Sequence, residues 1–340
     1  MDEDKLITAN VVPTPQIELQ ASGTPVDEVL SDQRKTEQDL LTSATQEVTA
    51  VIGTRLPSGE IIEHADSIGE GWNSRAFMVQ MRGRPKHIFL LLKTKDASTT
   101  VQSLTKAQPL LTEIETESPA KFPHIAFSST EEPPFVGYPA LPGQPLAKIF
   151  LELEPDEKMH VAQGMAQSLR KLHGVTPEQA EKHGIRKEDL LGKYEYYFGE
   201  NFLEREIAPH LDAAEYNTLC KFARQVRANP DFLQYQPRLI HGDLSLDNVI
   251  FERSSRALGI IDMEKISVSD PDKDIWHFCR TLPAELQREF LEEYGHENLQ
   301  LLKKKMSFFD VYRGLYLTEF RDKDGIQSLK GAIKNISSDN

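Results

Sequence analysis

The chain has 340 residues and a formal net charge of −14, because 53 acidic side chains outnumber 39 basic ones. This surplus disfavours wrapping nucleic acid or lying on an anionic membrane, since both need positively charged patches. The hydrophobic content of 39% is ordinary for a globular protein, and the apolar runs are too short to span a bilayer.

The number of cysteines and the first residues of the sequence indicate the cellular compartment. Cys220 and Cys279 are too few for a disulfide framework, and Asp2, Glu3 and Asp4 stand where a secretory signal would be positively charged. We therefore expect a cytoplasmic protein. Its length predicts two domains, and we assume a monomer.

Residues 1–36 are predicted to form an acidic, flexible extension. Residues 1–40 hold nine acidic and three basic side chains, with three prolines and few large apolar residues. A helix is expected to follow and to end at Gly53, because apolar residues recur there at three- and four-residue steps.

Residues 37–138 are predicted to form a small domain built on an antiparallel sheet. Its strands are short extended runs separated by turns: Ile61–Ile68, Ala76–Met81, His87–Leu92 and Phe135–Tyr138. A helix is expected over Thr99–Thr112, interrupted by Pro109. Prolines and a glycine make residues 139–143 a connector.

Residues 144–340 are predicted to form a mainly helical domain, which makes the fold class α+β. Amphipathic periodicity marks its helices: Asp156–His173, Leu190–Leu203, Ala213–Ala228, Ala284–Tyr294 and Leu301–Phe320. Its β-rich pieces are Arg238–Ile240, Val249–Phe251 and Leu258–Ile261. The basic run Lys303-Lys304-Lys305 is expected on a solvated helix face.

The most informative stretch begins at His241-Gly242-Asp243, just after a predicted strand. Asn248 follows five residues after Asp243, and Asp262 ends a further strand. Phosphoryl transfer needs one carboxylate to orient a hydroxyl, and oxygen ligands that hold Mg²⁺ against the phosphates of ATP or GTP. An isolated His-Gly-Asp would more simply be a turn, but this combination and spacing favour a kinase-like site.

These residues resemble the H-G-D-L-x-x-x-N motif of the aminoglycoside phosphotransferase family, small-molecule kinases with the two-lobed protein-kinase fold. The resemblance covers about residues 37–329. It implies that Asp243 is the catalytic base and that Asn248 and Asp262 bind Mg²⁺. It also implies structural support from His241, Asp270 and Asp274. Met263 departs from the aromatic residue that the family carries after this aspartate.

Residues 68–77 resemble the nucleotide loop of the family branch that phosphorylates the 2″ hydroxyl of aminoglycosides. Gly69 and Gly71 would let backbone amides approach phosphate oxygens, and Ser74 stands in place of a third glycine. A dinucleotide-binding loop would instead be followed by a helix, whereas Ala76–Met81 alternates like a strand.

Residues 135–146 resemble the hinge of the family, which implies that Tyr138 and Ala140 lie beside the nucleotide base. The alternative is an edge strand entering a proline turn. The family pattern puts the phosphate-binding cation nearer Leu90, and the helix glutamate that pairs with it at Ala107 or Gln108. We choose Lys93 as the phosphate contact; otherwise it is an exposed lysine at a strand end.

Acidic residues of the second domain, among them Glu200, Glu204 and Glu319, are expected to bind a cationic acceptor such as an aminoglycoside, in the manner of an antibiotic-resistance kinase. The alternative is that they are solvated helix faces. Residues 172–185 also resemble macrolide phosphotransferases, so a macrolide or metabolite alcohol is a second acceptor class. A non-catalytic, nucleotide-binding pseudokinase is the third hypothesis, suggested by the missing helix glutamate.

Overall fold

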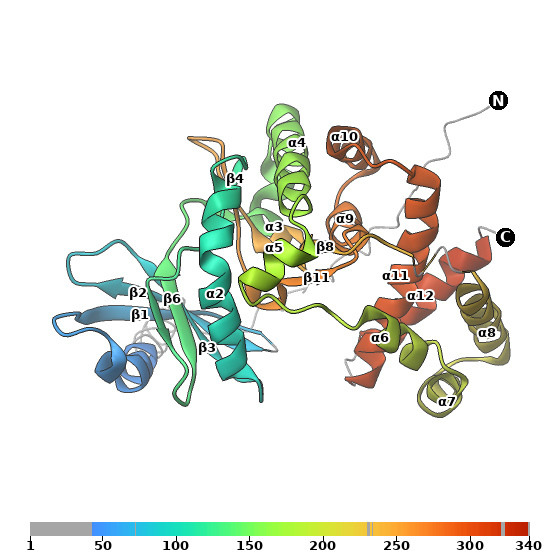
Figure 1. Cartoon of the computed structure of the whole chain (residues 1–340), viewed down its shortest axis with the longest axis horizontal. Coiled ribbons are helices and arrows are strands. Elements are labelled where there is room, and N and C mark those ends of the chain that lie inside the picture. The colour runs from blue at the N-terminus through green and yellow to red at the C-terminus, as the bar shows by residue number, and fades with distance from the viewer. Residues whose placement is uncertain (1–42, 72, 230–231, 233, 321–323, 339–340) are drawn as a thin grey trace, which may run out of the picture. The chain divides into compact units, whose positions relative to one another are not determined.

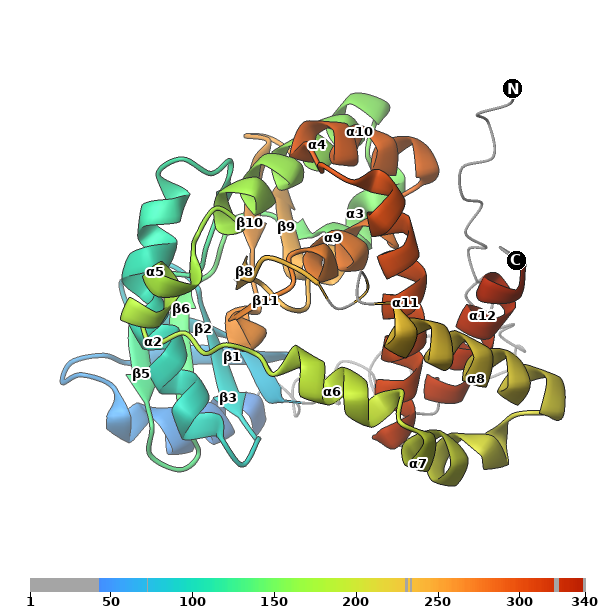
Figure 2. The same ribbon diagram turned by 45° about the vertical axis from the view of Figure 1, so that its right-hand side comes forward.

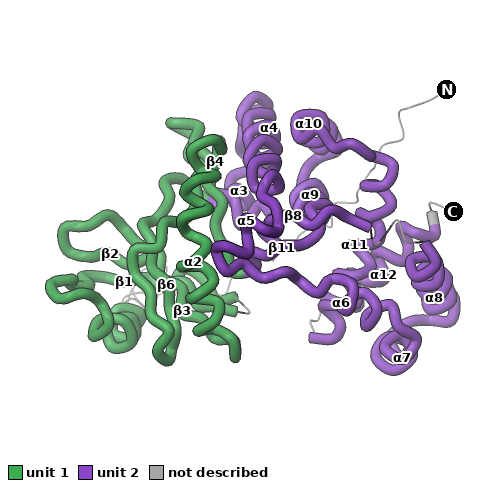
Figure 3. The backbone as a smooth tube through the Cα atoms, viewed as in Figure 1, with its two compact units in different colours: residues 1–144, 250–264 green, residues 145–249, 265–340 purple. Residues whose placement is uncertain are grey.

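The computed structural model describes residues 43–338 except 72, 230–231, 233 and 321–323. These fall into two compact units, residues up to 144 with 250–264, and residues 145–249 with 265 onwards (Figure 3). The predicted extension, residues 1–36, lies outside the described residues. Residues 250–264, predicted with the second domain, group with the first unit because β10 (Ala257–Ile260) pairs in parallel with β4 (Ala120–Lys121).

The first unit contains a five-stranded antiparallel sheet in the order β1-β2-β3-β6-β5 (Figures 1 and 2). Its strands are β1 (Ile62–Glu70), β2 (Ser74–Met81), β3 (His87–Leu92), β5 (Phe127–Ser129) and β6 (Phe135–Pro139). Phe77 pairs with Phe89, and Ile88 pairs with Tyr138. The predicted strands are therefore confirmed, with ends that differ by a few residues.

The two faces of this sheet carry different helices. Alternation along β3 places Phe89 and Leu91 in a core with Val48 and Ile52, from the helical residues 43–52. Leu90, between them, points to the other face, where it shares a pocket with residues of α2 (Ala97–Glu115).

Helix α2 runs through Pro109, which was expected to interrupt it. A proline at this position leaves the carbonyl of Thr105 without its helical donor. Both residues lie on the exposed face of the helix, where water can satisfy that carbonyl.

A second sheet, in the order β4-β10-β9-β7, includes β9 (Val249–Glu252) and β7 (Gln144–Pro145). Gly143 leads into it with a φ of 111°. A Cβ there would lie 2.5 Å from the carbonyl oxygen of Phe251, so only glycine fits this approach.

The second unit is mainly helical, as predicted. Its helices are α3 (Leu146–Ile149), α4 (Pro155–Leu172), α5 (Pro177–Lys182), α6 (Leu190–Tyr197), α7 (Glu200–Phe202), α8 (Ala213–Ala228), α9 (Asp272–Cys279), α10 (Ala284–Tyr294), α11 (Leu299–Glu319) and α12 (Gly325–Ser338). The strands β8 (Arg238–Ile240) and β11 (Ser267–Ser269) pair antiparallel. The second unit also contains the short 3-10 turns Phe150–Glu152, Ala208–His210 and Leu246–Asn248, and the π-turn Leu203–Ile207. Gly53–Arg55 is a 3-10 turn of the first unit. The 3-10 turn Met263–Lys265 spans the point in the sequence where the first unit ends and the second resumes.

Helix pairs organise this unit: α10 packs along α4, and α12 packs against α11 and α8 (Figure 2). The bounds predicted for α8 and α10 are confirmed. The helix predicted over Leu190–Leu203 ends early, at Tyr197. None of the helices among the described residues has a stretch long and apolar enough to cross a membrane.

One expectation for α11 is wrong. Lys305, predicted to face solvent with its two neighbours, has only 1% of its surface exposed. Its Nζ lies 2.6 Å from Asp270 and 2.5 Å from Asp272, because those buried carboxylates need a counter-charge. Lys303 and Lys304 are exposed, as expected.

Candidate active site

The loop after β8 is held by a buried carboxylate. Asp274, on α9, accepts hydrogen bonds from the backbone N–H groups of His241 and Gly242, at 2.7 and 2.8 Å. His173 bonds the hydroxyl of Tyr294 through Nδ1, and its Nε2 lies 3.2 Å from the same carboxylate. Burial alone would raise the pKa of Asp274, but these partners outweigh it and lower the pKa to about 2. Asp274 therefore stays ionised and fixes the loop backbone.

Gly242 gives this loop its turn. Its φ is 88°, and a Cβ at this position would lie 2.6 Å from the carbonyl oxygen of Lys265. Any other residue would be strained and would displace the neighbouring chain. The backbone of Asp243 is also fixed, because its N–H donates to Nδ1 of His241 at 3.2 Å.

The carboxylate of Asp243 faces two basic side chains. The ammonium of Lys265 lies 2.6 Å from Oδ2, and Nε2 of His277 lies 4.0 Å from Oδ1. Burial would raise the pKa of Asp243, but Lys265 and then His277 outweigh it, so the net shift is downward. Burial lowers the pKa of His277 to about 3, which keeps that ring neutral near pH 7 and leaves Lys265 as the main counter-charge. Asp243 is therefore ionised, with Oδ1 the less engaged oxygen.

Asn248 lies in the same loop, at the end of a 3-10 turn. Its amide nitrogen donates to the carbonyl of Asp243 at 2.8 Å, which fixes the amide plane and leaves its Oδ1 as an acceptor. Asp262, in the other unit, adopts a φ of 62°, rare for a residue with a side chain. A carboxamide oxygen and a carboxylate are the hard donors that Mg²⁺ prefers, so the chemistry of each residue, taken by itself, suits the predicted metal. The described residues hold no cluster of three or more His, Cys, Asp or Glu side chains placed for a metal ion.

Asp270 lies in a separate buried cluster rather than against the loop. Its carboxylate pairs with Lys305, and it accepts a hydrogen bond from the N–H of Asp272 at 3.1 Å. Nε2 of His296 lies 2.8 Å from Asp272. Burial raises the pKa of Asp270 to about 6. The contact of Asp270 is thus with α11, whereas Asp274 touches the loop.

The glycine-bearing turn between β1 and β2 leaves space at its glycines. The N–H of Gly71 donates to the carbonyl of Ser74 at 2.8 Å, which closes the turn. A Cβ at Gly69 would meet nothing within 4 Å. Trp72 lies outside the described residues. The turn therefore has room for a group to approach its backbone at Gly69, and its binding role stays a prediction.

Lys93 lies just after β3 and contacts this turn. Its Nζ is 2.7 Å from Glu70, whose carboxylate is 4.0 Å from Arg75. Arg75 in turn bonds Glu47 of the helical residues 43–52. Lys93 is therefore on the sheet face opposite to Leu90.

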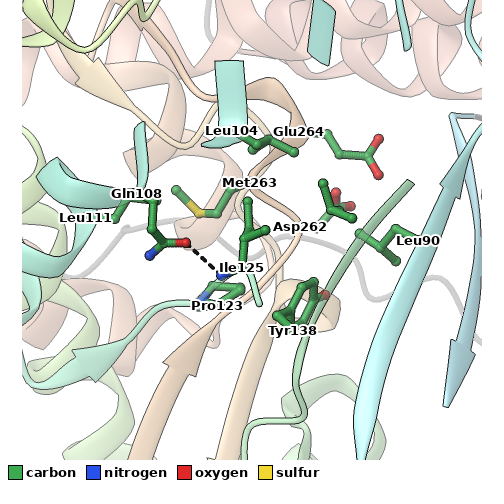
Figure 4. A pocket seen from close by; sticks show the side chains of 11 residues that line it. Leu90, Leu104, Gln108, Leu111, Pro123, Ile125, Tyr138, Asp262, Met263 and Glu264 are labelled. Atoms are coloured by element: carbon green, nitrogen blue, oxygen red, sulfur yellow. Dashed lines mark hydrogen bonds between the residues drawn. The ribbon is translucent and has the colours of Figure 1, made fainter. Parts of the chain in front are cut away.

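The first unit contains a small pocket of about 20 Å³, room for about one water molecule (Figure 4). It is mostly apolar, and its lining comes from the sheet, α2 and the segment after β10: Leu90, Leu104, Gln108, Leu111, Pro123, Ile125, Val136, Tyr138, Asp262, Met263 and Glu264. Oε1 of Gln108 accepts from the N–H of Ile125 at 2.8 Å. The strand position expected to carry a cation is thus a leucine facing this pocket, and the helix position expected to carry a glutamate is a glutamine.

Tyr138 and Ala140 differ in their surroundings. Burial, followed by Asp262 and Glu264, raises the pKa of Tyr138, so its phenol stays protonated. The N–H of Ala140 donates to the carbonyl of Lys86 at 2.8 Å and is not available to a base. Backbone groups alternate along an extended chain, so we expect the carbonyl of Pro139, the last residue of β6, and the N–H of Leu141 to point the other way. Those two groups are better placed than Ala140 to pair with a base edge.

The three predicted acceptor residues lie on α7, the following π-turn and the end of α11, and two of them have partners inside the protein. Glu200 is 3.3 Å from Arg227. Glu319 accepts hydrogen bonds from the hydroxyls of Tyr196, at 2.9 Å, and Tyr197. Glu204 is exposed.

Sequence reasoning missed Lys265, His277 and His173 as neighbours of the loop. His173 is buried against Asp274. His277 follows Asp274 by three residues, a spacing that places both on one helix face and was the available signal. For Lys265 no local signal existed, because its partner is 22 residues away.

Three known proteins that are similar to this chain help to interpret the site. Acyl-CoA dehydrogenase family member 11 of Homo sapiens is 23% identical over an alignment of 166 residues that covers 44% of this chain and only 20% of that relative. The chain thus spans about a fifth of the length of this curated relative. The structure of the GDP and kanamycin complex of APH(2")-IIia matches with a TM-score of 0.72 and 26% identity, covering 86% of this chain and 99% of that one.

A macrolide 2'-phosphotransferase, MphH from Brachybacterium faecium, matches with a TM-score of 0.60 and 16% identity, over 87% of this chain and 98% of that one. At that identity it shows the fold alone. These structures confirm the α+β, kinase-like fold class. The model of the phosphotransferase enzyme family matches residues 64–309, more than half of the sequence and with the Asp243 loop inside it, and the chain belongs to that family.

Proposed function

We propose that this protein transfers the γ-phosphoryl group of ATP or GTP to a hydroxyl of a small-molecule acceptor. The observation that carries the proposal is the geometry of the Asp243 loop, in which Asp274 fixes the backbone and Lys265 holds one carboxylate oxygen. The membership of the phosphotransferase enzyme family agrees with it.

Asp243 orients the acceptor in this reaction. With Oδ2 bonded to Lys265, Oδ1 accepts the hydrogen bond of the attacking hydroxyl. The hydroxyl oxygen forms a bond to the γ-phosphorus, the bond from that phosphorus to the β–γ bridging oxygen breaks, and the nucleoside diphosphate leaves. The hydroxyl proton passes to Asp243. The lowered pKa of Asp243 makes it a weak base. This suits a group that orients the hydroxyl, because a loose transition state needs little proton transfer before the bond to phosphorus forms.

Asn248 and Asp262 are the proposed Mg²⁺ ligands. When bound, the ion neutralises charge on the phosphate oxygens. Asn248 also bonds the carbonyl of Asp243, so one side chain links the ion site to the loop. Gly69, Gly71 and Ser74 would approach the phosphates, and Pro139 and Leu141 the base.

The acceptor class has two candidates. An aminoglycoside is the first, because the kanamycin complex of APH(2")-IIia is among the similar structures; phosphorylation would add negative charge to such a polycation. A macrolide or metabolite alcohol is the second, favoured because Glu200 and Glu319 are already engaged within the protein.

The test is a phosphate-transfer screen with ATP and GTP over aminoglycosides, macrolides and metabolite alcohols. Asp243→Ala is the blank, and Asp247→Ala, an exposed carboxylate of the same loop, is the matched control. We expect transfer by the native chain and the control, and none by Asp243→Ala. Full activity in Asp243→Ala refutes the role of that residue, and nucleotide binding without transfer to any acceptor supports the pseudokinase.

A further inference from the structure

Arg280, at the end of α9, has a cationic side chain without a carboxylate partner. Within the described part of the chain it forms no ion pair within 4 Å, and its side chain is exposed. Its guanidinium lies 5.2 Å from the centre of the Trp276 ring, and the indole N–H of Trp276 donates to Asp310 at 3.0 Å. The indole therefore holds the guanidinium in place without neutralising it.

This guanidinium lies on the side of the catalytic loop. His277 is 4.0 Å from Oδ1 of Asp243, and Arg280 follows His277 by three residues, which places both on one face of the helix end. The charge of Arg280 also acts on Asp243. A group bound to Arg280 would thus be a neighbour of the hydroxyl that Asp243 orients.

The local charge is positive. Arg313, on α11, is near Arg280, and its guanidinium donates a 3.4 Å hydrogen bond to the hydroxyl of Ser328. Asp310 acts on both arginines. Asp243 also acts on Arg280, but its carboxylate is paired with Lys265. Although Arg280 is exposed as a residue, neighbouring groups partly desolvate its charged end. This desolvation and then Arg313 lower the pKa of Arg280, so its cation is under-compensated. A bound anion would relieve this.

We propose that Arg280 binds an anionic group of the acceptor, so that the substrate is an alcohol carrying a carboxylate or a phosphate. The inference rests on the proposed phosphoryl transfer and names its substrate class. It separates this chain from kinases of polycations, because an ammonium group placed at Arg280 would be repelled. A guanidinium suits both carboxylate and phosphate, since its N–H groups pair with two oxygens.

The chain itself supplies a reporter for the test. It has two tryptophans, Trp72 and Trp276, so Trp72→Phe leaves the indole beside Arg280 as the sole tryptophan emitter. Its fluorescence is followed at constant ionic strength with three alcohols of one length, 6-hydroxyhexanoate, 1,6-hexanediol and 6-aminohexan-1-ol. Glycerol 3-phosphate against glycerol forms the phosphate arm. Arg280→Gln is the test variant, and Arg224→Gln, an exposed arginine on α8, is the control.

We expect a saturable change with an anionic member only, weakened at least about tenfold by Arg280→Gln and unchanged by Arg224→Gln, because a charge-assisted hydrogen bond is lost. The arm that saturates at the lower concentration identifies the anion. Equal responses to neutral and anionic alcohols, or no response to any anion, overturn the proposal. Transfer to kanamycin with no response to anions overturns this inference and leaves the proposed function standing. A response to an anionic alcohol that the chain then fails to phosphorylate leaves the anion site standing and counts against the function.

Discussion

The ammonium of Lys265 lies 2.6 Å from Oδ2 of Asp243, and the carbonyl of Lys265 fills the space that a side chain at Gly242 would need. Lys265 therefore contacts the catalytic loop with both its backbone and its side chain. This pairing makes the ionisation of Asp243 depend on a residue outside the recognised motif.

Lys265→Met should move the acid limb of the pH profile of kcat/KM to higher pH. In the native chain the pKa of Asp243 lies below its usual value, so the carboxylate is present above that pKa and lost as pH falls through it. Without Lys265, burial raises the pKa and the carboxylate is lost at a higher pH. We also expect kcat to fall on the order of a hundredfold, by loss of a charge near the transferred group.

Lys265→Arg should keep most of the native profile, because it keeps the charge. Lys193→Met is the control: its side chain is 47% exposed against 46% for Lys265, and it pairs with Glu188 at 2.8 Å. An unchanged acid limb in Lys265→Met would contradict the pairing in solution.

Asp274→Asn should destabilise the protein more than any other single change in the loop. The carboxylate is fully buried and accepts two backbone N–H groups, which an amide nitrogen would oppose. Breaking such a buried network costs about 3 to 5 kcal/mol. The thermal midpoint, measured beside Asp247→Asn, checks this.

The same aspartate predicts a pH window. Its pKa is about 2 when folded, against a usual 3.8, so its contribution of about 2 kcal/mol is present above pH 3.8 and is lost as pH falls towards 2. The Asn variant should show a flatter loss of stability over that window than the native chain.

The sequence predicted those parts of the fold that depend on local pattern. The bounds of α8 and α10 follow from periodicity, and Asn248 lies immediately before β9, close to the strand start expected for it. The prediction that Lys305 faces solvent was wrong. A run of three lysines is typical of a solvated helix face, but Lys305, the third of them, lies on the buried face of the helix. Its buried partners come from a segment 33 to 35 residues away in the chain, a relationship that no window of sequence contains.

The phosphate-binding cation is a second feature that the sequence alone did not locate. Strand alternation places Leu90 on the face of α2 and puts Lys93 with Glu70 on the other. The family pattern puts the cation at the strand position that is Leu90 in this sequence, so no cation stands there. Lys265 was not considered, since its closeness to Asp243 arises only when β11 pairs with β8.

Lys305→Met should destabilise the second unit in a pH-dependent way. The variant leaves Asp270 and Asp272 buried without their shared cation, which costs about 3 to 5 kcal/mol. The pKa of Asp270 is about 6, above its usual 3.8, so the cost of burying its charge builds up as pH rises from 3.8 to 6. Because Lys305 lowers this pKa, its removal raises the pKa further, and the cost then keeps growing above pH 6. The loss should be larger at pH 7.5 than at pH 5. Lys304→Met, one residue away and exposed, should leave the thermal midpoint unchanged at both.

Asn248→Ala should raise the Mg²⁺ concentration needed for half-maximal activity. The change removes a proposed ligand and the bond to the carbonyl of Asp243, and losses of this kind cost about 10- to 100-fold in metal affinity. Activity is titrated with Mg²⁺ at saturating nucleotide. A variant with the native Mg²⁺ requirement but lower kcat would assign Asn248 to the loop alone.

Substitutions at Lys93 and Glu70 distinguish two roles for Lys93, a contact to the nucleotide phosphates and a surface ion pair. If Lys93 turns from Glu70 to the nucleotide, Lys93→Met should raise the KM for the nucleotide about tenfold, by loss of a charge-assisted contact. Glu70→Gln should then lower that KM, because it releases the lysine. An exposed pair contributes little to stability, so both thermal midpoints should stay near the native value. Unchanged nucleotide KM in both variants would make Lys93 a strand-end lysine and leave the phosphates to Lys265 and the glycine turn.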